Sequence, residues 1–334
     1  MYLNEIARII MNRSRLDIEV LSTPVFAGLF GPQLSVDNYD LGDGYILKKE
    51  QACLIRPFVI ALDKDMSGAY DLSKSKSVYG TAGIDINLQL TIPIDGPTSK
   101  ASAQHAYWLI ASLRLATRSI FCPILSVIEF SHLKKAHETP PIVPLENPPA
   151  FLDMQRVGDD VINIKDLEWV KNNWRTAKRL ADQNSNFYDA FVLFESSLFC
   201  NDMGSATLTI WSALERLFSL SFEDQSPNLS FTMAHYLAPN DANARHIYEK
   251  IMKLYAARHM VVDGHGFGET DIMVDTIELS FRVFSKIIES GQMPVKRQAA
   301  RISIEIPIPD NDEETWRKFR EASNDFTDTE HRPV

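Results

Sequence analysis

Residues 255–265 read Tyr255-Ala256-Ala257-Arg258-His259-Met260-Val261-Val262-Asp263-Gly264-His265, a helical pattern that ends at a glycine. The apolar residues before it recur at helical spacing, and Arg258 is the next member of the series Ile247, Ile251, Leu254. The guanidinium of Arg258 is therefore expected on the apolar face of this helix. A guanidinium placed there needs an anion or several hydrogen-bond acceptors.

An upstream segment supplies one such anion. Residues 211–218 read Trp211-Ser212-Ala213-Leu214-Glu215-Arg216-Leu217-Phe218, with apolar residues at the spacing of a core helix. Glu215 is a candidate partner for Arg258. A buried Arg–Glu pair with a purely structural role is one interpretation of these two segments.

Together the two segments resemble the Apea-like branch of the HEPN family. In that branch a helix with the pattern W-S-A-L-E-x-L-F precedes a helix that ends in Y-x-x-R-x-x-x-x-H-G. The resemblance covers about residues 164–291. It implies a helical bundle that pairs as a homodimer, with two Arg-x-x-x-x-His motifs facing each other across the interface.

The resemblance also implies an activity, the metal-independent cleavage of RNA in toxin or antiviral defence systems of prokaryotes. The ribose 2′-hydroxyl attacks the adjacent phosphate and leaves a cyclic phosphate. Histidine suits the proton transfer because its reference pKa lies near neutrality. Arginine suits the phosphate because its planar fork is permanently charged. Arg258 matches the arginine of the motif.

The histidine position of the motif departs from the family. Five residues after Arg258 stands Asp263, and Gly264 matches the glycine that follows the family histidine. Aspartate, with a reference pKa of about 3.9, is a weak base at pH 7 and repels phosphate. Weak or absent cleavage is therefore expected. An introduced replacement that silences a toxic nuclease is a further interpretation.

Five further residues complete the candidate site. His259 and His265 flank the missing base and are candidates to replace it, although an exposed histidine in a loop or at a helix end, without a catalytic role, is the more common case. Glu215, Tyr255 and Gly264 match family positions and are expected to orient Arg258 or to contact substrate. The alternative to a nuclease is a non-catalytic HEPN scaffold that dimerises and binds RNA, a nucleotide or a regulatory protein partner.

Composition limits these interpretations. The chain has 334 residues and a formal net charge of −10, which argues against broad affinity for nucleic acid and leaves room only for a local basic cleft. Its cysteines are scattered (Cys53, Cys122, Cys200), as in proteins of a reducing cytosol. We expect a cytoplasmic protein with no membrane span, no metal-ligand set and no cofactor.

Hydrophobic periodicity divides the chain into an α+β N-terminal domain followed by an all-α HEPN-type helical bundle domain. We expect an α+β sensor or regulatory domain at 1–137, a proline-rich linker at 138–163, the helical domain at 164–291 and a C-terminal extension at 292–334. A small-molecule sensor in the first domain is a third interpretation. Strands are expected at 18–21, 45–47, 52–62, 84–92 and 121–130. Helices are expected from 98 or 99 to 118 and at 166–182, 187–200, 205–220, 230–237, 241–260, 271–291 and 312–323.

Overall fold

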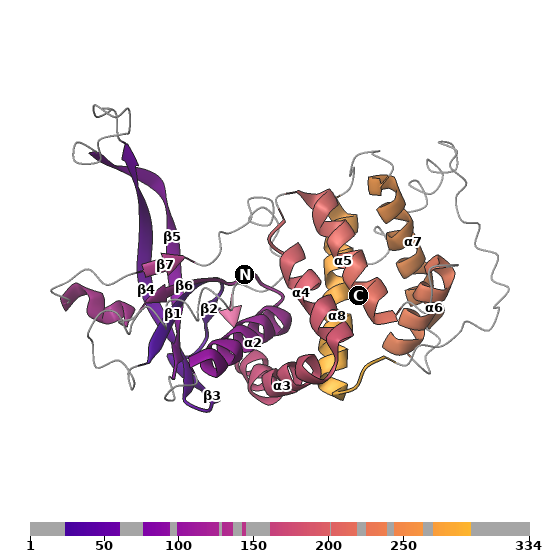
Figure 1. Cartoon of the computed structure of the whole chain (residues 1–334), viewed down its shortest axis with the longest axis horizontal. Coiled ribbons are helices and arrows are strands. Elements are labelled where there is room, and N and C mark those ends of the chain that lie inside the picture. The colour runs from indigo at the N-terminus through magenta and orange to yellow at the C-terminus, as the bar shows by residue number, and fades with distance from the viewer. Residues whose placement is uncertain are drawn as a thin grey trace, which may run out of the picture.

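The computed structural model shows an N-terminal antiparallel sheet region followed by a mostly helical C-terminal region (Figure 1). It describes residues 24–60, 76–93, 99–126, 129–135, 142–144, 161–200, 202–218, 225–238, 244–262 and 270–294. The predicted strand at 18–21 and the predicted helix at 312–323 lie outside these residues. An α+β region followed by helices is therefore confirmed, as the alternating and helical patterns predicted.

The sheet has six strands, and every neighbouring pair is antiparallel. In spatial order they are β3 (Asn38–Gly42), β4 (Tyr45–Ile60), β5 (Lys76–Ile92), β1 (Val25–Phe30), β6 (Cys122–Ser126) and β7 (Ile142–Pro144). The long β4–β5 hairpin extends beyond the rest of the sheet (Figure 1). The two strands predicted at 45–47 and 52–62 join in β4 through an irregularity between Lys49 and Ala52.

The strand predicted at 121–130 is shorter than expected. It ends at Ser126, and Phe130 begins the 3-10 helix η4 (Phe130–Lys135). The amide of Phe130 donates to the side-chain Oε1 of Gln89 at 2.8 Å, so it is unavailable to a strand ladder. A side-chain acceptor on a neighbouring strand is not visible in local periodicity.

The two regions share one hydrophobic core. Helix α2 (Ser99–Thr117) carries Trp108, whose ring centre lies 4.8 Å from that of Phe191 in helix α4 (Ser185–Ser197). A short parallel pair, β2 (Gln33–Leu34) with β8 (Val161–Ile162), leads directly into helix α3. β7 and β8 fall inside the segment predicted as a linker, and the domain boundaries stay a prediction.

Six helices follow in the described part of the C-terminal region: α3 (Ile164–Gln183), α4 (Ser185–Ser197), α5 (Met203–Phe218), α6 (Gln225–Leu237), α7 (Ala244–Val262) and α8 (Thr270–Ser290). Helix α8 ends at Ser290, directly before Gly291, where the sequence predicts the end of the helix. Gly291 has a φ of +64°, a conformation that glycine adopts readily. Helix α6 begins earlier than predicted, with Pro227 in its first turn. Proline is tolerated there because first-turn amides have no partner within the helix.

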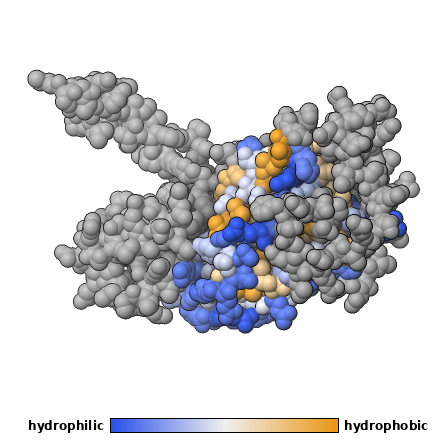
Figure 2. Space-filling view, turned by 45° about the vertical axis from the view of Figure 1, so that its right-hand side comes forward, coloured by the Kyte–Doolittle hydropathy of each residue, from blue (hydrophilic) through white to orange (hydrophobic). Residues whose placement is uncertain are grey.

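One face of the described surface carries both hydrophilic and hydrophobic residues (Figure 2). Figure 2 shows hydrophilic residues gathered along the lower edge of the described surface, where Figure 1 places α3. Within the described residues, no helix combines the length and the apolar character needed to cross a membrane.

A buried ion pair joins α2 to α4. Arg114 and Glu195 contact each other with side chains only 2% and 7% exposed. Arg114 also donates from Nη2 to the carbonyl oxygen of Phe121 at 2.5 Å, and its guanidinium lies 4.8 Å from the ring of Phe199. This pair fixes the approach of the sheet region to the helices.

Asp202 caps the N-terminus of α5, and we expect Asp202→Ala to lower the free energy of unfolding by about 0.5–2 kcal/mol. Its Oδ1 accepts the Ser205 amide at 2.7 Å. That backbone hydrogen bond holds the pKa of Asp202 below its usual range. The stabilisation is therefore present above the usual carboxyl pKa and is lost as pH falls through the lowered value. Urea unfolding at pH 7 and near pH 3 checks this.

Asp202→Asn is the matched control, because asparagine also caps but does not titrate. The gap in stability between the wild-type chain and Asp202→Asn should shrink on acidification. A gap that stays constant between the two pH values would contradict the assignment.

Candidate functional site

The two motif segments meet between α5 and α7. The Nη2 of Arg258 lies 3.3 Å from the Oε1 of Glu215, and the hydroxyl of Tyr255 donates to the same oxygen at 2.8 Å. The guanidinium of Arg258 also lies 5.4 Å from the centre of the Tyr255 ring. We call these three residues the Glu215–Tyr255–Arg258 cluster. The ion pair anticipated from the sequence is present.

The buried Trp211 packs against the Tyr255 ring of the cluster. Trp211 is fully buried on α5, and its ring meets that of Tyr255 edge-on at 4.9 Å. The indole Nε1 of Trp211 has no hydrogen-bond partner among the described residues, so the ring contributes packing. Because the aromatic pair fixes the Tyr255 ring, its hydroxyl is held against Glu215.

The cluster reaches the surface without being open to it. The side chain of Arg258 is 22% exposed and that of Glu215 is 18% exposed. The Nε of Arg258 is buried and has no hydrogen-bond partner within the described part of the chain. A guanidinium has five N–H donors, so the contact with Glu215 leaves donors for a further acceptor.

The hydroxyl of Tyr255 stays a donor at neutral pH. Burial raises the pKa of Tyr255 well above its usual range, and the hydrogen bond to the Glu215 carboxylate raises it further. A protonated phenol and a cation therefore share one carboxylate oxygen. The arrangement holds Arg258 in place, and the hydroxyl of Tyr255 does not serve as a general base near pH 7, because it keeps its proton.

We expect Tyr255→Phe to lower the free energy of unfolding by about 0.5–1.5 kcal/mol, because it removes one hydrogen bond and keeps the ring. The measurement is urea unfolding, with Tyr248→Phe on the same helix as control. Among the described residues the hydroxyl of Tyr248 has no hydrogen-bond partner. Equal losses in the two variants would contradict a structural role for the Tyr255 hydroxyl.

The remaining predicted site residues fall into two groups. His259 follows Arg258 on α7, is exposed, and has its ring 5.3 Å from that of Tyr255. It lies beside the cluster. Asp263, Gly264 and His265 lie outside the described residues, so their predicted roles stay predictions. Helix α7 ends at Val262, directly before them.

No set of His, Cys, Asp or Glu side chains is placed to hold a metal ion within the described residues. Comparison with protein-family models, with curated proteins and with solved structures finds no match to this chain. The cluster geometry and the motif spacing are therefore what a functional proposal must rest on.

Proposed function

We propose that this chain is an RNA-directed protein of the HEPN type, in which Arg258 binds a phosphate of the RNA. The observation that carries the proposal is the meeting of both motif segments in the Glu215–Tyr255–Arg258 cluster. Tyr255 and Glu215 are 40 residues apart in sequence, yet they share a hydrogen bond, and both lie against the guanidinium of Arg258. Arginine binds phosphate through a charged, planar fork, and neighbours that orient its guanidinium support that role.

The charge arrangement also supports phosphate binding. Glu215 contacts the Nη2 of Arg258, and the Arg258 side chain is 22% exposed, so part of this side chain is open to solvent. A phosphate oxygen can therefore join the guanidinium while Glu215 keeps it oriented. Arg258 lies one turn from the end of α7, and the motif continues beyond that end into Asp263.

Cleavage by the chain as it stands is expected to be weak or absent. The motif position of the general base holds Asp263, and aspartate at its reference pKa is a poor base at neutral pH. The homodimer that the HEPN resemblance implies would bring two copies of Arg258 and Asp263 together. A carboxylate at that interface pairs with arginine more readily than it accepts the 2′-hydroxyl proton.

One observation favours a second candidate, the non-catalytic HEPN scaffold. Arg258 already has a counter-ion in Glu215, and both side chains are mostly buried. A neutralised arginine at a helix end fits a structural pair that supports dimerisation and docking of a regulatory partner. The net charge of −10 agrees with this candidate as well.

The dependence of RNA binding on Arg258 separates the two candidates. We expect Arg258→Ala to bind RNA about tenfold more weakly at low salt, because one charge-assisted hydrogen-bonding group is lost. The plot of log affinity against log salt concentration should become less steep by about one unit, as expected when one phosphate contact is lost. A fluorescence titration with labelled single-stranded RNA measures both quantities.

Arg216→Ala is the matched control. Arg216 is exposed, lies next to Glu215 on α5 and pairs with Asp189. Its loss should leave RNA affinity unchanged. Two results favour the scaffold candidate over the RNA-directed one. In the first, Arg258→Ala and Arg216→Ala both bind RNA as tightly as the wild-type chain. In the second, none of the three proteins binds RNA.

A further inference from the structure

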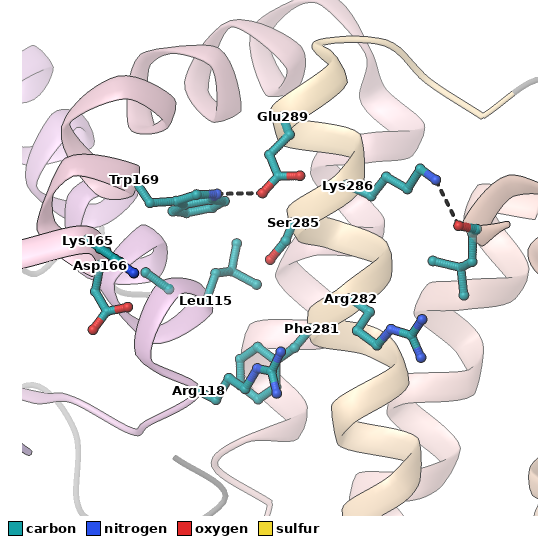
Figure 3. Close-up of a pocket in the computed structure, with 12 residues that line it drawn as sticks. Leu115, Arg118, Lys165, Asp166, Trp169, Phe281, Arg282, Ser285, Lys286 and Glu289 are labelled. Atoms are coloured by element: carbon teal, nitrogen blue, oxygen red, sulfur yellow. Dashed lines mark hydrogen bonds between the residues drawn. The ribbon is translucent and has the colours of Figure 1, made fainter. Parts of the chain in front are cut away.

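A groove of about 580 Å³ follows one face of α8, away from the Glu215–Tyr255–Arg258 cluster. Its other walls come from the C-terminal end of α2, the first turns of α3 and the end of α6 (Figure 3). The lining residues on α8 run from Phe281 to Glu289, which is about 12 Å along the helix axis. A groove that follows a helix in this way has the shape of a site for a polypeptide segment.

Basic side chains stand on both sides of α8. Figure 3 draws Lys165 on one side of this helix and Arg282 and Lys286 on the other. The whole chain has 34 basic and 44 acidic residues, but the groove reverses this balance and attracts anions. It is lined by four basic residues (Arg118, Lys165, Arg282, Lys286) and two acidic ones (Asp166, Glu289). Positive charges placed on either side of a helix suit an extended acidic segment better than one compact anion.

Two of the basic side chains are free to meet such a segment. Lys165 and Arg282 are exposed and have no ion-pair or hydrogen-bond partner among the described residues. The acidic residues of the groove are engaged elsewhere, since Asp166 accepts the amide of Asn163 at 3.0 Å and Glu289 accepts the indole N–H of Trp169 at 2.6 Å. New carboxylates can therefore pair with Lys165 and Arg282 without breaking an existing contact.

The groove also has an apolar floor. Leu115 and Phe281 line it and are each only 2% exposed. Trp169 and Leu237 line it as well and are partly exposed, and the hydrogen bond to Glu289 fixes the orientation of the indole. Aromatic side chains of an occupant would bury apolar surface against these residues. The groove thus calls for carboxylates and aromatic rings close together in one segment.

Residues 310–319 of this chain carry both features. They read Asp310-Asn311-Asp312-Glu313-Glu314-Thr315-Trp316-Arg317-Lys318-Phe319, with four carboxylates within five residues. Trp316 and Phe319 follow at a spacing of three, which places both on one face of the helix predicted at 312–323. Residues 1–23 have three acidic and three basic residues and contain no such run. Both of these segments lie outside the described residues.

The chain is long enough to bring residues 310–319 to the groove. Helix α8 ends at Ser290, nine residues or about 14 Å beyond Phe281 at the far end of the groove. The 15 residues 295–309 follow the described residue Pro294 and can span up to about 50 Å when extended. A short tether of this kind gives a local concentration on the order of millimolar, so even a weak contact is populated.

We infer that residues 310–319 dock in the groove over α8 of the same chain. The acidic run pairs with Lys165 and Arg282, and the aromatic side chains pack against Trp169 and Leu237. Docking offsets the positive charge of the groove and covers its partly exposed apolar surface. This contact does not involve Arg258 or RNA, so it stands or falls separately from the proposed function.

Carbodiimide cross-linking of the full chain tests the contact directly, because the reagent joins carboxylates to amines that lie against them. The Nζ of Lys165 should attack an activated carboxylate within 310–314, so that an amide forms and the carbodiimide leaves as a urea. Mass spectrometry of the monomer should find this link, with a yield that tenfold dilution leaves unchanged. A link confined to dimers would place the segment of a second copy in the groove and would overturn the inference.

Chymotrypsin measures how firmly the segment docks, since it cleaves after Trp316 and Phe319, which docking should protect. The double variant Lys165→Glu/Arg282→Glu should be cleaved there about tenfold faster at low salt, because charge-assisted contacts are lost. Both side chains are exposed, so the change leaves the fold intact. Arg245→Glu is the matched control, at an exposed arginine on α7 outside the groove, and should leave the cleavage rate unchanged.

Charge reversal in the segment completes the test. Asp312→Lys/Glu313→Lys/Glu314→Lys should speed cleavage as the groove variant does. A chain with both sets of changes should return toward the slow wild-type rate, because the paired charges are exchanged. The inference is overturned if the wild-type chain is cleaved as fast as the groove variant, or if the combined chain is cleaved as fast as either set alone.

Discussion

Arg114→Met is expected to lower the free energy of unfolding by about 3–5 kcal/mol, because it leaves the buried Glu195 without its counter-charge. Methionine retains the aliphatic volume, so the loss comes mainly from the charge. Urea unfolding followed by far-UV circular dichroism measures the difference. The control is Arg118→Met, directly after the end of α2, where the partly exposed pair with Glu278 should contribute no more than about 1 kcal/mol.

The pH dependence of the Arg114→Met variant has a definite sign. Burial raises the pKa of Glu195, and the guanidinium of Arg114 opposes that rise. Without Arg114 the folded chain should keep a proton on Glu195 at pH values above about 4.3, the reference pKa at which the unfolded chain releases it. Stability of the variant should therefore fall as pH rises, relative to the wild-type chain.

The double variant Arg114→Met/Glu195→Leu tests whether the pair itself is the cause. Removing both charges together should recover most of the stability lost in Arg114→Met, since no ion is left buried. A double variant as unstable as the single one would attribute the loss to packing around α2 and α4 instead.

Asp263→His is expected to give the second large effect, a gain of about 10²–10⁴-fold in RNA cleavage. The change supplies a general base at the motif position five residues after Arg258 and removes a carboxylate that repels phosphate. Incubation with mixed cellular RNA in EDTA measures it. The rate should rise with pH through about 6.5, the reference pKa of histidine.

Asp263→Asn is the matched control, since it removes the negative charge and adds no base. It should not cleave RNA. Cleavage by the wild-type chain at the rate of Asp263→His would contradict the prediction and would assign the base to Asp263, His259 or His265.

The parts of the fold that follow from local pattern were predictable. The alternating residues at 84–92 lie within β5, and the helical series through Trp211 and Ile251 lie within α5 and α7. Each depends on which residues face a core, and periodicity reports that directly. The Glu215–Arg258 pair was predictable for the same reason, because an arginine on an apolar face requires an anion.

The features that depend on distant residues were not predictable. Arg114 and Glu195 are 81 residues apart, and nothing in either helix marks it as the partner of the other. Side chains from four helices line a groove over α8. Each charged residue among them resembles an ordinary solvated charge when its own segment is considered alone. The early start of α6 was missed because Pro227 signals a break except in a first turn.

The most direct test of the central claim compares cleavage of one defined RNA by Asp263→His and by Asp263→His/Arg258→Ala, in EDTA, with analysis of the product ends. We propose that the Glu215–Tyr255–Arg258 cluster forms the phosphate-binding half of an RNA site. Asp263→His should produce 2′,3′-cyclic phosphate ends, and the added loss of Arg258 should remove that activity. Equal cleavage by the two variants, or none by either together with no RNA binding, would contradict the claim.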